Sequence, residues 1–483
     1  MLINLKLKEK KRKEKQKKRI VNKIWLKKSC REGYLDNLRG EIMLVKKWRC
    51  TVCDELFDYD KKPATCPVCG VGQELFELVE VDVSANSIER EVDVIIIGGG
   101  VAAVNAADTI STRNKKARMT IISKEKYLPY YRTRLTEILD TDIPMERMEI
   151  KKQSWYDERN IKVMLNEEVT AILSEEKAVT ISNGEKLKYD FLVIASGARC
   201  FVPPFENKEL AGVRVIRELE ETLEIKEIAK KCKNVVVIGG GVLGLEAAWG
   251  IKNLGANVTV LEVMPRVLPR QLDEKGSALL ERMIKTSGVN ILTGVEVKGF
   301  AGDGKVEKVL LKDGKEIEAE LVIISAGIAP NKEFAISSGI EVNRGIIVNE
   351  RMETSLKDVY ACGDIAEYNG RIIGLWQVAM EQGKIVGANI CGDEKVYTEQ
   401  IQPLSFEGMN TQLLSIGEVK CQADCTEIVE DYNETRDMYK KFFFKNDILK
   451  GALLIGDISK SVAVIKAVRE ETRKNQILIK IYN

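Results

Sequence analysis

Two stretches of this sequence decide the fold: VDVIIIGGGVAAVNAADTI at residues 92–110 and VVVIGGGVLGLEAAWGIKNLG at residues 235–255. Each begins with a short apolar run, continues through three glycines and ends in a segment with helical spacing. This order predicts a strand, a tight turn and a helix. Near-continuous apolar strands are typical of parallel sheets that are buried on both faces. The recurrence therefore predicts an α/β fold with two doubly wound, Rossmann-like units.

The small residues in both turns have the spacing of a dinucleotide-binding loop. The motifs are Gly98-x-Gly100-x-x-Ala103 and Gly239-x-Gly241-x-x-Gly244. The first glycine makes the turn, the second lets a pyrophosphate approach the backbone, and the third small residue lets helix and strand pack closely. Two ordinary tight turns are disfavoured because both copies stand in the strand–turn–helix context that this chemistry needs.

An acidic residue ends the strand that follows the second loop. Glu262 closes the apolar run 258–261, where a carboxylate accepts hydrogen bonds from ribose hydroxyls. It would repel a 2′-phosphate, which favours NADH over NADPH, but Arg266 one turn later leaves NADPH open. In the first unit the matching strand end is Ser123, and Glu125 two residues later is the expected ribose ligand.

Four cysteines precede the first loop in two pairs, as Cys50-x2-Cys53-x12-Cys66-x2-Cys69. Four thiolates at this spacing close a tetrahedron, which holds zinc or iron, and on the cysteines alone both metals stay open. Other cysteines fall beside predicted buried elements and are expected to be inert, namely Cys200, Cys232, Cys362 and Cys391. The pair Cys421-x3-Cys425 has poor metal spacing.

The composition narrows the chemistry further. The 483 residues include eleven cysteines and no histidine. This excludes catalysis and metal ligation by histidine and leaves the chemistry to cofactors. The sequence has no apolar run of about 18 residues and no signal-peptide h-region. We therefore expect a cytoplasmic protein with free thiols and with no membrane or nucleic-acid partner.

The formal charge of +2 conceals a basic head. Residues 1–42 carry 15 Lys and Arg against 5 Asp and Glu, whereas the rest carries 60 against 68. Such a basic segment would either bind an acidic partner or remain a solvated, disordered tail. A third hypothesis is preferred, in which translation starts at Met43, because Arg39-Gly40-Glu41 can be encoded by a sequence that resembles a ribosome-binding site. Residues 1–42 are then expected to add nothing to fold or turnover.

Residues 91–395 resemble the flavoprotein reductases that have two dinucleotide-binding domains. Besides the two loops, YDFLVIASGA (189–198) and VIISAGIAPN (322–331) resemble the strands that cross between the FAD and NAD domains. TSLKDVYACGD (354–364) resembles the second FAD motif. The resemblance implies that FAD binds at Gly98, Gly100, Ala103, Glu125, Arg132, Ala195, Gly197, Gly363 and Asp364. It implies that NADH binds at Gly239, Gly241, Gly244 and Glu262.

The resemblance also places two features near the reacting rings. Gln382-Gly383 fits the helix that points toward the isoalloxazine, and Glu246 sits where the family often has a glutamate near the nicotinamide. For Glu246 a solvated or capping role is an equal alternative. No catalytic residue beyond the cofactors is implied.

The absence of certain residues distinguishes branches of this superfamily. Residues 91–199 contain no cysteine, which excludes the disulfide reductases and the single-cysteine NADH oxidases and peroxidases. KYLPYYRTRL (126–135) resembles the PYxRxxL segment of rubredoxin, ferredoxin and nitrite reductase flavoproteins, with Arg132 and Leu135 at matching places. Ferredoxin reductases usually have lysine at the position of Glu137, which favours the NADH:rubredoxin reductases. Residues 401–483 resemble the small C-terminal domain of that group.

The cysteine-rich segment has a resemblance of its own. KWRCTVC and CPVCG, with twelve residues between them, resemble the short rubredoxin domains of rubrerythrins, with Trp48, Phe57 and Phe76 as the aromatic core. Asp54 departs from the usual glycine, and its charge beside the sulfurs would lower the iron potential. Attachment to a flavoprotein reductase favours iron over a structural zinc.

We therefore expect an α/β protein with an NAD domain inserted into an FAD domain, and with small domains at both ends. The expected segments are a basic extension (1–42), a rubredoxin-like four-cysteine domain (43–83), the first part of the FAD domain (91–205), the NAD domain (206–328), the second part of the FAD domain (329–400) and a C-terminal α+β domain (401–483). In the last, GALLIG (451–456) and ILIKIY (477–482) read as strands, and residues 460–472 read as a helix.

The preferred function is an NADH:rubredoxin oxidoreductase fused to its rubredoxin. Electrons would pass from NADH to FAD, to Fe(Cys)4 and to a downstream redox protein, which the resemblance suggests detoxifies oxygen or peroxide. One alternative is a flavoprotein reductase of nitrite or a quinone, with the metal as a relay. Another is a zinc ribbon for docking or redox sensing. The sequence specifies neither the terminal acceptor nor the oligomeric state.

Overall fold

The computed structural model describes residues 44–51, 55–57, 62–68, 72–82, 88–420 and 427–482. The basic head, Cys53, Asp54, Cys69 and the Cys421/Cys425 pair lie outside these ranges. Lys46–Val81 and Ser87–Asn483 belong to one compact unit.

The first glycine-rich stretch forms the centre of a parallel sheet. β4 (Val92–Ile97) leads through the glycines into α2 (Val101–Arg113). The sheet has the order β22-β10-β4-β5-β6. Its other strands are β5 (Ala117–Ile122), β6 (Ile161–Met164), β10 (Phe191–Ile194) and β22 (Val359–Ala361), all parallel to their neighbours.

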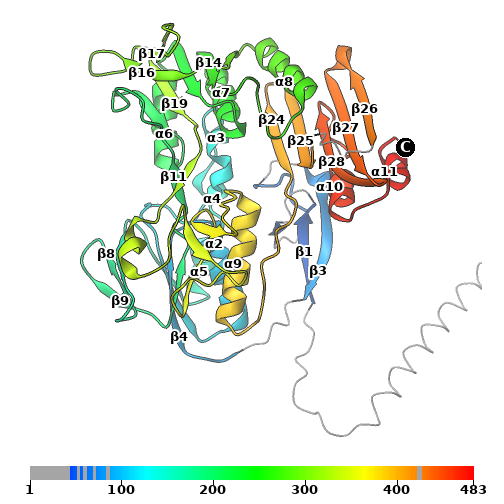
Figure 1. Ribbon diagram of the computed structural model, residues 1–483. Helices are drawn as coiled ribbons and strands as arrows, with labels where there is room; N and C mark the ends of the chain where they lie inside the picture. The colour runs from blue at the N-terminus through cyan, green and yellow to red at the C-terminus, as the bar shows by residue number, and fades with distance from the viewer. Residues whose placement is uncertain are drawn as a thin grey trace, which may run out of the picture. The chain divides into compact units, whose positions relative to one another are not determined.

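A long helix from much later in the chain covers α2. This helix, α9 (Trp376–Ile390), lies beside α2 in Figure 1. A Cβ atom on Gly383 would lie 2.3 Å from the Ala102 carbonyl oxygen, so only glycine allows the two helices to approach this closely. The α/β unit that carries the first loop is therefore built from segments near both ends of the region 91–395.

The second glycine-rich stretch forms a second parallel sheet of order β12-β19-β13-β14-β15. Its strands are β12 (Val213–Val215), β13 (Asn234–Ile238), β14 (Asn257–Glu262), β15 (Asn290–Thr293) and β19 (Leu321–Ile324). Its helices are α6 (Leu219–Ala229), α7 (Val242–Asn253) and α8 (Glu274–Thr286). Four of the five β13 residues are buried, as expected for a central strand covered on both faces.

Two crossing segments connect the sheets. β11 (Ala198–Cys200) leads toward the second sheet and pairs antiparallel with β20 (Ile328–Pro330), which returns from it. Ser196 Oγ donates to the Asn331 carbonyl oxygen at 3.0 Å, and Asn331 Nδ2 donates to the Ser196 carbonyl oxygen at 3.0 Å. The second sheet is thus inserted into the chain of the first, which confirms the expected fold class.

Short strands and helices flank these sheets. The strands are β7 (Val169–Leu173), β8 (Ala178–Ile181), β9 (Lys186–Lys188), β16 (Val297–Ala301), β17 (Lys308–Leu311), β18 (Glu316–Glu318), β21 (Ile346–Val348) and β23 (Ala366–Tyr368). The helices are α3 (Leu135–Ile138), α4 (Met145–Met148) and α5 (Gln153–Asp157).

The C-terminal segment forms an antiparallel sheet of order β24-β25-β28-β27-β26 with two helices. The strands are β24 (Leu404–Gly408), β25 (Thr411–Gly417), β26 (Glu427–Asn433), β27 (Met438–Lys445) and β28 (Ile448–Ile455), and the helices are α10 (Ser461–Arg469) and α11 (Lys474–Tyr482). The predicted strand at ILIKIY is wrong, because these residues form α11. Ile477 and Ile481, four residues apart, are buried, whereas Ile479 is 62% exposed, which is the pattern of a helix.

The cysteine-rich segment has a three-stranded sheet of order β2-β1-β3. The strands are β1 (Leu44–Cys50), β2 (Leu56–Phe57) and β3 (Phe76–Asp82). Phe57 and Phe76 lie with ring centroids 5.7 Å apart, and Trp48 packs against the same apolar cluster. The three aromatic residues expected to form this small core therefore share one cluster with Cys50 and Cys66.

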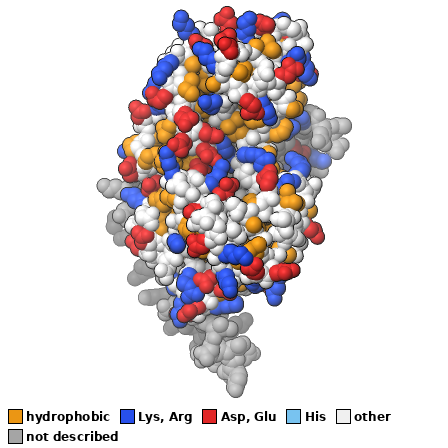
Figure 2. All heavy atoms as spheres, turned by 90° about the vertical axis from the view of Figure 1, so that its left-hand side faces the viewer, with side chains coloured by type: hydrophobic (Ala, Val, Ile, Leu, Met, Phe, Trp, Pro, Cys, Tyr) orange, Lys and Arg blue, Asp and Glu red, His pale blue; other side chains and the backbone are white. Residues whose placement is uncertain are grey.

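Surface charges are mixed rather than separated. On the face in Figure 2, acidic and basic side chains are interspersed with small hydrophobic areas. Many exposed charges are paired, such as Arg118 with Asp93 and Lys186 with Glu176. Exposed pairs of this kind are screened by solvent and contribute little, so stability comes mainly from the apolar clusters. In the described part of the chain, no helix has both the length and the apolarity to span a bilayer.

Candidate functional site

The first glycine loop leaves room for a ligand at one position and excludes side chains at another. Gly98 has a φ of +111°, and a Cβ atom there would lie 2.2 Å from the Ala195 carbonyl oxygen. Gly100 is the N-cap of α2, and a Cβ atom there would meet nothing within 4 Å. Ala103 is fully buried beneath the turn. Open space at a helix N-terminus, where backbone N–H groups lack partners, suits a pyrophosphate.

The second loop repeats this geometry. Gly239 has a φ of +113°, and a Cβ atom there would lie 2.2 Å from the Ser325 carbonyl oxygen. Gly241 faces open space, and a Cβ atom on Gly244 would lie 2.0 Å from the Gly239 carbonyl oxygen. Ala195 and Ser325 directly follow β10 and β19, which pair with the loop-bearing strands in the two sheets. Both loops therefore fit a dinucleotide.

Glu262 is held against the second loop. Its Oε2 accepts from the Gly240 N–H at 2.6 Å and its Oε1 accepts from the Met264 N–H at 2.7 Å. A carboxylate has about four lone-pair sites, so acceptor capacity remains for a ribose. Arg266 instead donates to the Leu272 carbonyl oxygen at 2.7 Å and to Ser277 Oγ at 2.8 Å. Its guanidinium is therefore engaged by the segment that leads into α8.

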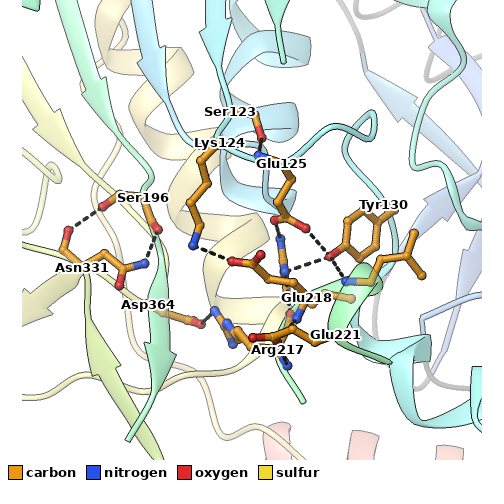
Figure 3. A network of polar contacts seen from close by, with 12 residues as sticks. Ser123, Lys124, Glu125, Tyr130, Ser196, Arg217, Glu218, Glu221, Asn331 and Asp364 are labelled. Carbon is orange, nitrogen blue, oxygen red and sulfur yellow. Dashed lines mark hydrogen bonds and ion pairs between the residues drawn. The ribbon is translucent and has the colours of Figure 1, made fainter. Parts of the chain in front are cut away.

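Near the first loop, an aromatic and charged network joins the two sheets (Figure 3). Glu125 accepts from Tyr130 Oη and from Arg132, each at 2.6 Å. Arg132 also donates to the Arg217 carbonyl oxygen at 2.6 Å, and Tyr130 Oη accepts from the Leu219 N–H at 3.0 Å. Burial raises the pKa of Tyr130 well above its usual range, so the hydroxyl stays protonated. Glu125 and Arg132 are thus held together, and their contact with FAD remains a prediction.

Arg217 reaches the predicted second FAD motif. Its guanidinium donates to Asp364 Oδ2 at 2.9 Å (Figure 3). The neighbouring Gly363 has a φ of +81°, and its N–H donates to Gln382 Oε1 at 2.8 Å. The sequence did not predict Arg217, whereas Tyr130 lies within the PYxRxxL-like segment but was not named as a site residue. The signal at Arg217 is weak: it directly precedes Glu218, which forms a capping box with Glu221 at the start of α6.

Glu246 points toward the first domain rather than capping a helix. It lies within α7, and its Oε2 accepts from Thr136 Oγ1 at 2.9 Å. Burial raises its pKa to about 7, against the smaller lowering effect of the Thr136 hydrogen bond. A carboxyl that changes protonation near neutral pH inside a cleft is typical of functional sites.

A cleft of about 2300 Å³ runs from the first loop to Glu246 on α7, whereas the glycines of the second loop and Glu262 are not among its lining residues. Single ligand pockets have volumes of roughly 300–1000 Å³, so this space is larger than one small ligand needs. Its lining includes Gly98–Ala102, Ser123–Glu125, Arg132, Gly197, Arg217, Glu246 and Asp364. Thr133 Oγ1 and Trp376 Nε1 also belong to lining residues, and both atoms are buried without a hydrogen-bond partner among the described residues. Such atoms suit a polar cofactor, since buried polar groups are normally paired.

The cysteine-rich segment contributes to the same cleft. Pro63–Val68, which includes Cys66, is part of its lining. Cys50 and Cys66 are 0% and 2% exposed. The two thiols share one apolar cluster, a setting that suits the soft ligand set of zinc or iron. The other two predicted ligands, Cys53 and Cys69, lie outside the described residues.

Four further cysteines have raised thiol pKa values because of burial. The pKa of Cys362 rises to about 12 and that of Cys391 to about 11. The pKa values of Cys200 and Cys232 are also raised. Because the thiolate is the reactive form, these cysteines are expected to be unreactive.

Two dinucleotide loops on parallel sheets, joined by paired crossing strands, define an oxidoreductase with two nucleotide-binding domains. Residues 92–383 match the family described as pyridine nucleotide-disulphide oxidoreductase. The chain belongs to this family. Residues 405–472 match the rubredoxin NAD+ reductase C-terminal domain, and residues 48–77 match the rubrerythrin, rubredoxin-like domain.

Several relatives match most of this chain. The chain is 33% identical to the NADH-rubredoxin oxidoreductase of Clostridium acetobutylicum, over 78% of this chain and 95% of that one. The crystal structure of that enzyme has a TM-score of 0.66 at 30% identity, and the match covers 81% of this chain and all of that one. A NAD-dependent persulfide reductase from A. fulgidus has a TM-score of 0.72 at 29% identity, with 80% and 78% covered.

Two relatives are much longer than the matched region. The chain is 33% identical to the nitrite reductase [NAD(P)H] of Bacillus subtilis, over 78% of this chain. It is 31% identical to the assimilatory nitrate reductase electron transfer subunit of the same organism, over 75% of this chain. It spans about half of each, at 47%.

Proposed function

We propose that this chain is an NADH:rubredoxin oxidoreductase fused to its own Fe(Cys)4 domain. The observation that carries the proposal is that the Cys66 loop lines the same cleft as the first glycine loop and Asp364. FAD, when bound, supplies the conversion between two-electron transfer from NADH and one-electron transfer to iron. The match of residues 48–77 to a rubredoxin-like domain and of residues 405–472 to the C-terminal domain of rubredoxin NAD+ reductases supports this assignment.

In this proposal the protein's residues bind and orient the cofactors. FAD would be held at Gly98, Gly100, Ala103, Glu125, Arg132, Ala195, Gly197, Gly363 and Asp364, and NADH at Gly239, Gly241, Gly244 and Glu262. Arg217 joins the FAD set, because it bonds Asp364 and lines the cleft. Glu246 would face the nicotinamide.

NADH is proposed over NADPH for two reasons. Glu262 is fixed beside the second loop, where a carboxylate repels a 2′-phosphate. Arg266, which left NADPH open, donates to backbone and hydroxyl oxygens near α8. Iron is proposed over zinc because a metal that changes oxidation state completes an electron path from a flavin. A cytoplasmic location and a downstream redox protein, such as one that detoxifies oxygen or peroxide, complete the proposal.

The test is the visible spectrum and metal content of the anaerobically purified protein. We expect iron with a thiolate charge-transfer band, together with a flavin spectrum. In a single-turnover experiment NADH should bleach the flavin first and the iron band second. Zinc in place of iron, or an iron band that NADH leaves unchanged while the flavin is reduced, would overturn the electron path.

A second candidate is a flavoprotein reductase of a small molecule such as nitrite. The identity to the B. subtilis nitrite reductase favours it, although the match covers only 47% of that relative. The discriminating measurement is steady-state NADH oxidation with nitrite or a quinone as the sole acceptor. Turnover that equals the rate with a rubredoxin acceptor would favour this second function.

A further inference from the structure

Lys226 is the one lysine that is buried among the described residues, at 7% exposure. It belongs to α6, and its Nζ donates to the Ile138 carbonyl oxygen at 2.9 Å, to the Thr141 carbonyl oxygen at 3.2 Å and to Asp142 Oδ1 at 2.7 Å. An ammonium group has three protons, so these bonds satisfy it fully. A buried lysine is costly unless it is paired in this way.

The carbonyl oxygens are the more important partners. The Asp142 side chain is 99% exposed, so solvent screens its ion pair with Lys226. Ile138 instead ends α3, where the last carbonyl groups lack partners within the helix. Lys226 therefore acts mainly as a cap on the C-terminal end of α3, which belongs to the chain of the first sheet.

α3 and the residues after it are wedged between two helices of the second sheet, α6 and α7 (Figure 1). Leu139 is fully buried in the apolar cluster of that sheet. A Cβ atom on Gly250 would lie 3.0 Å from Leu139 Cβ and 3.2 Å from the Thr136 carbonyl oxygen. Asn253 Nδ2 donates to Asp140 Oδ2 at 2.6 Å. α6 and α7 therefore both fix the position of α3.

α3 in turn forms one wall of the cleft. Thr136, Glu137 and Asp140 line it, as do Glu246 and Gly250 of the facing helix α7. Thr136 Oγ1 donates to Glu246 Oε2 across this wall. Lys226 is not among the lining residues, so its influence on the cleft is indirect.

We propose that Lys226 is a positioning residue for the nicotinamide end of the cleft. By holding α3, it keeps the Thr136 hydroxyl on Glu246 and sets the separation between the two nucleotide-binding domains at this point. The inference rests on the proposed function, because it concerns where NADH reacts. The proposal requires that a substitution of Lys226, which lies outside the cleft, changes the KM for NADH more than it changes the stability of the fold.

The test compares Lys226→Met with Asp142→Asn as the matched control in the FAD-loaded protein. Lys226→Met leaves the buried Ile138 carbonyl group unpaired and removes the bond to Thr141, so α3 should shift and the KM for NADH should rise by about tenfold or more. Asp142→Asn removes only the exposed ion pair and should leave the KM for NADH equal to that of the wild-type protein. Lys226→Met with an unchanged KM would overturn the proposal. Should Lys226→Met not fold, Lys226→Gln is measured in its place against the same criteria.

Hydrogen exchange provides a readout that is independent of turnover. In the absence of NADH, Lys226→Met should speed amide exchange in residues 135–142 and leave strands β13 and β14 protected. Faster exchange throughout the second sheet, with an unchanged KM, would show a purely structural role and refute the positioning. If the unchanged chain does not oxidise NADH, the proposed function fails, and the exchange pattern alone decides whether Lys226 holds α3.

Discussion

At the scale of single residues, Glu246 shows how burial changes a common side chain into a titrating group. In water a glutamate carboxyl is ionised at neutral pH, but in α7 desolvation raises its pKa to about 7. The Thr136 hydroxyl, a neutral donor at 2.9 Å, lowers the pKa by less than burial raises it. The cleft wall therefore changes charge within the physiological range.

We predict that the Glu246 carboxyl titrates near pH 7 in the folded protein. An infrared difference spectrum should show a protonated carboxyl band at pH 6 that disappears by about pH 8 and is missing in Glu246→Gln. Because the folded pKa lies above the unfolded value of 4.5, ionisation destabilises the fold. The unchanged chain should therefore lose stability relative to Glu246→Gln between about pH 5 and pH 7, by up to about 3 kcal/mol. A band that has vanished by pH 5 would contradict this prediction.

Glu262 gives a second prediction at this scale. Glu262→Gln keeps the size of the side chain but removes the charge that repels a 2′-phosphate. The ratio of kcat/KM for NADH over NADPH should fall by about 10–100-fold, equivalent to roughly 1.4–2.8 kcal/mol. Arg266→Ala is the matched control and should leave the ratio unchanged, because Arg266 is engaged by Leu272 and Ser277. If Arg266→Ala changed the ratio and Glu262→Gln did not, the assignment of NADH selectivity to Glu262 would be wrong.

At the scale of elements, the strand–turn–helix units assign different tasks to neighbouring glycines. Gly241 faces open space at the start of α7, and its φ of −77° suits any residue. Gly244 lies one turn later, and its missing side chain lets the Gly239 carbonyl oxygen approach to 2.0 Å from the Cβ position. The first position is proposed to serve the ligand, and the second serves the packing of the helix on the sheet.

Gly241→Ala and Gly244→Ala should therefore fail in different ways. Gly241→Ala should keep its melting temperature within about 2 °C but raise the KM for NADH by about tenfold, since the new methyl group occupies the pyrophosphate space. Gly244→Ala should lower stability by about 1–3 kcal/mol, because the backbone must move. Equal losses of stability in both variants would show that the open space at Gly241 is not a ligand site.

Comparison of the elements also shows how much of the fold and the site could be predicted from the sequence. Both loops and their sheets could be predicted because each signal is local: apolar run, glycine spacing and helix follow one another within about 20 residues. ILIKIY was misassigned because a short, mostly apolar run does not distinguish a buried strand from a helix. Arg217 and Lys226 could not be predicted, since each acts on residues that lie 80 or more positions away and meet it only through the tertiary fold.

At the scale of the whole molecule, polar contacts connect the C-terminal sheet to the second nucleotide-binding sheet. Asp273, the N-cap of α8, accepts from Tyr439 Oη and from Lys441 Nζ, each at 2.7 Å. Burial acts to raise the pKa of Asp273, but its hydrogen bonds together hold that pKa below its usual range. Burial and the neighbouring Asp273 raise the pKa of Tyr439. The C-terminal sheet is thus fixed to the reductase, and the cysteine-rich segment shares an apolar cluster with residues of that sheet.

The last prediction concerns the independence of the metal and flavin sites. Cys50 lies in β1, whereas the residues proposed to hold FAD come from segments between Gly98 and Asp364. Cys50→Ser should remove a metal ligand, so iron content should fall to near zero. FAD content and the rate of flavin reduction by NADH should stay within about twofold of the wild-type values, because no proposed FAD or NADH contact is altered.

Cys232→Ser, which changes a half-buried thiol outside the cleft lining, is the matched control and should keep iron, flavin and electron transfer. Loss of flavin together with iron in Cys50→Ser would show that the cysteine-rich segment is part of the flavin site itself. The transfer step would then have to be reinterpreted as taking place within one composite site rather than between two.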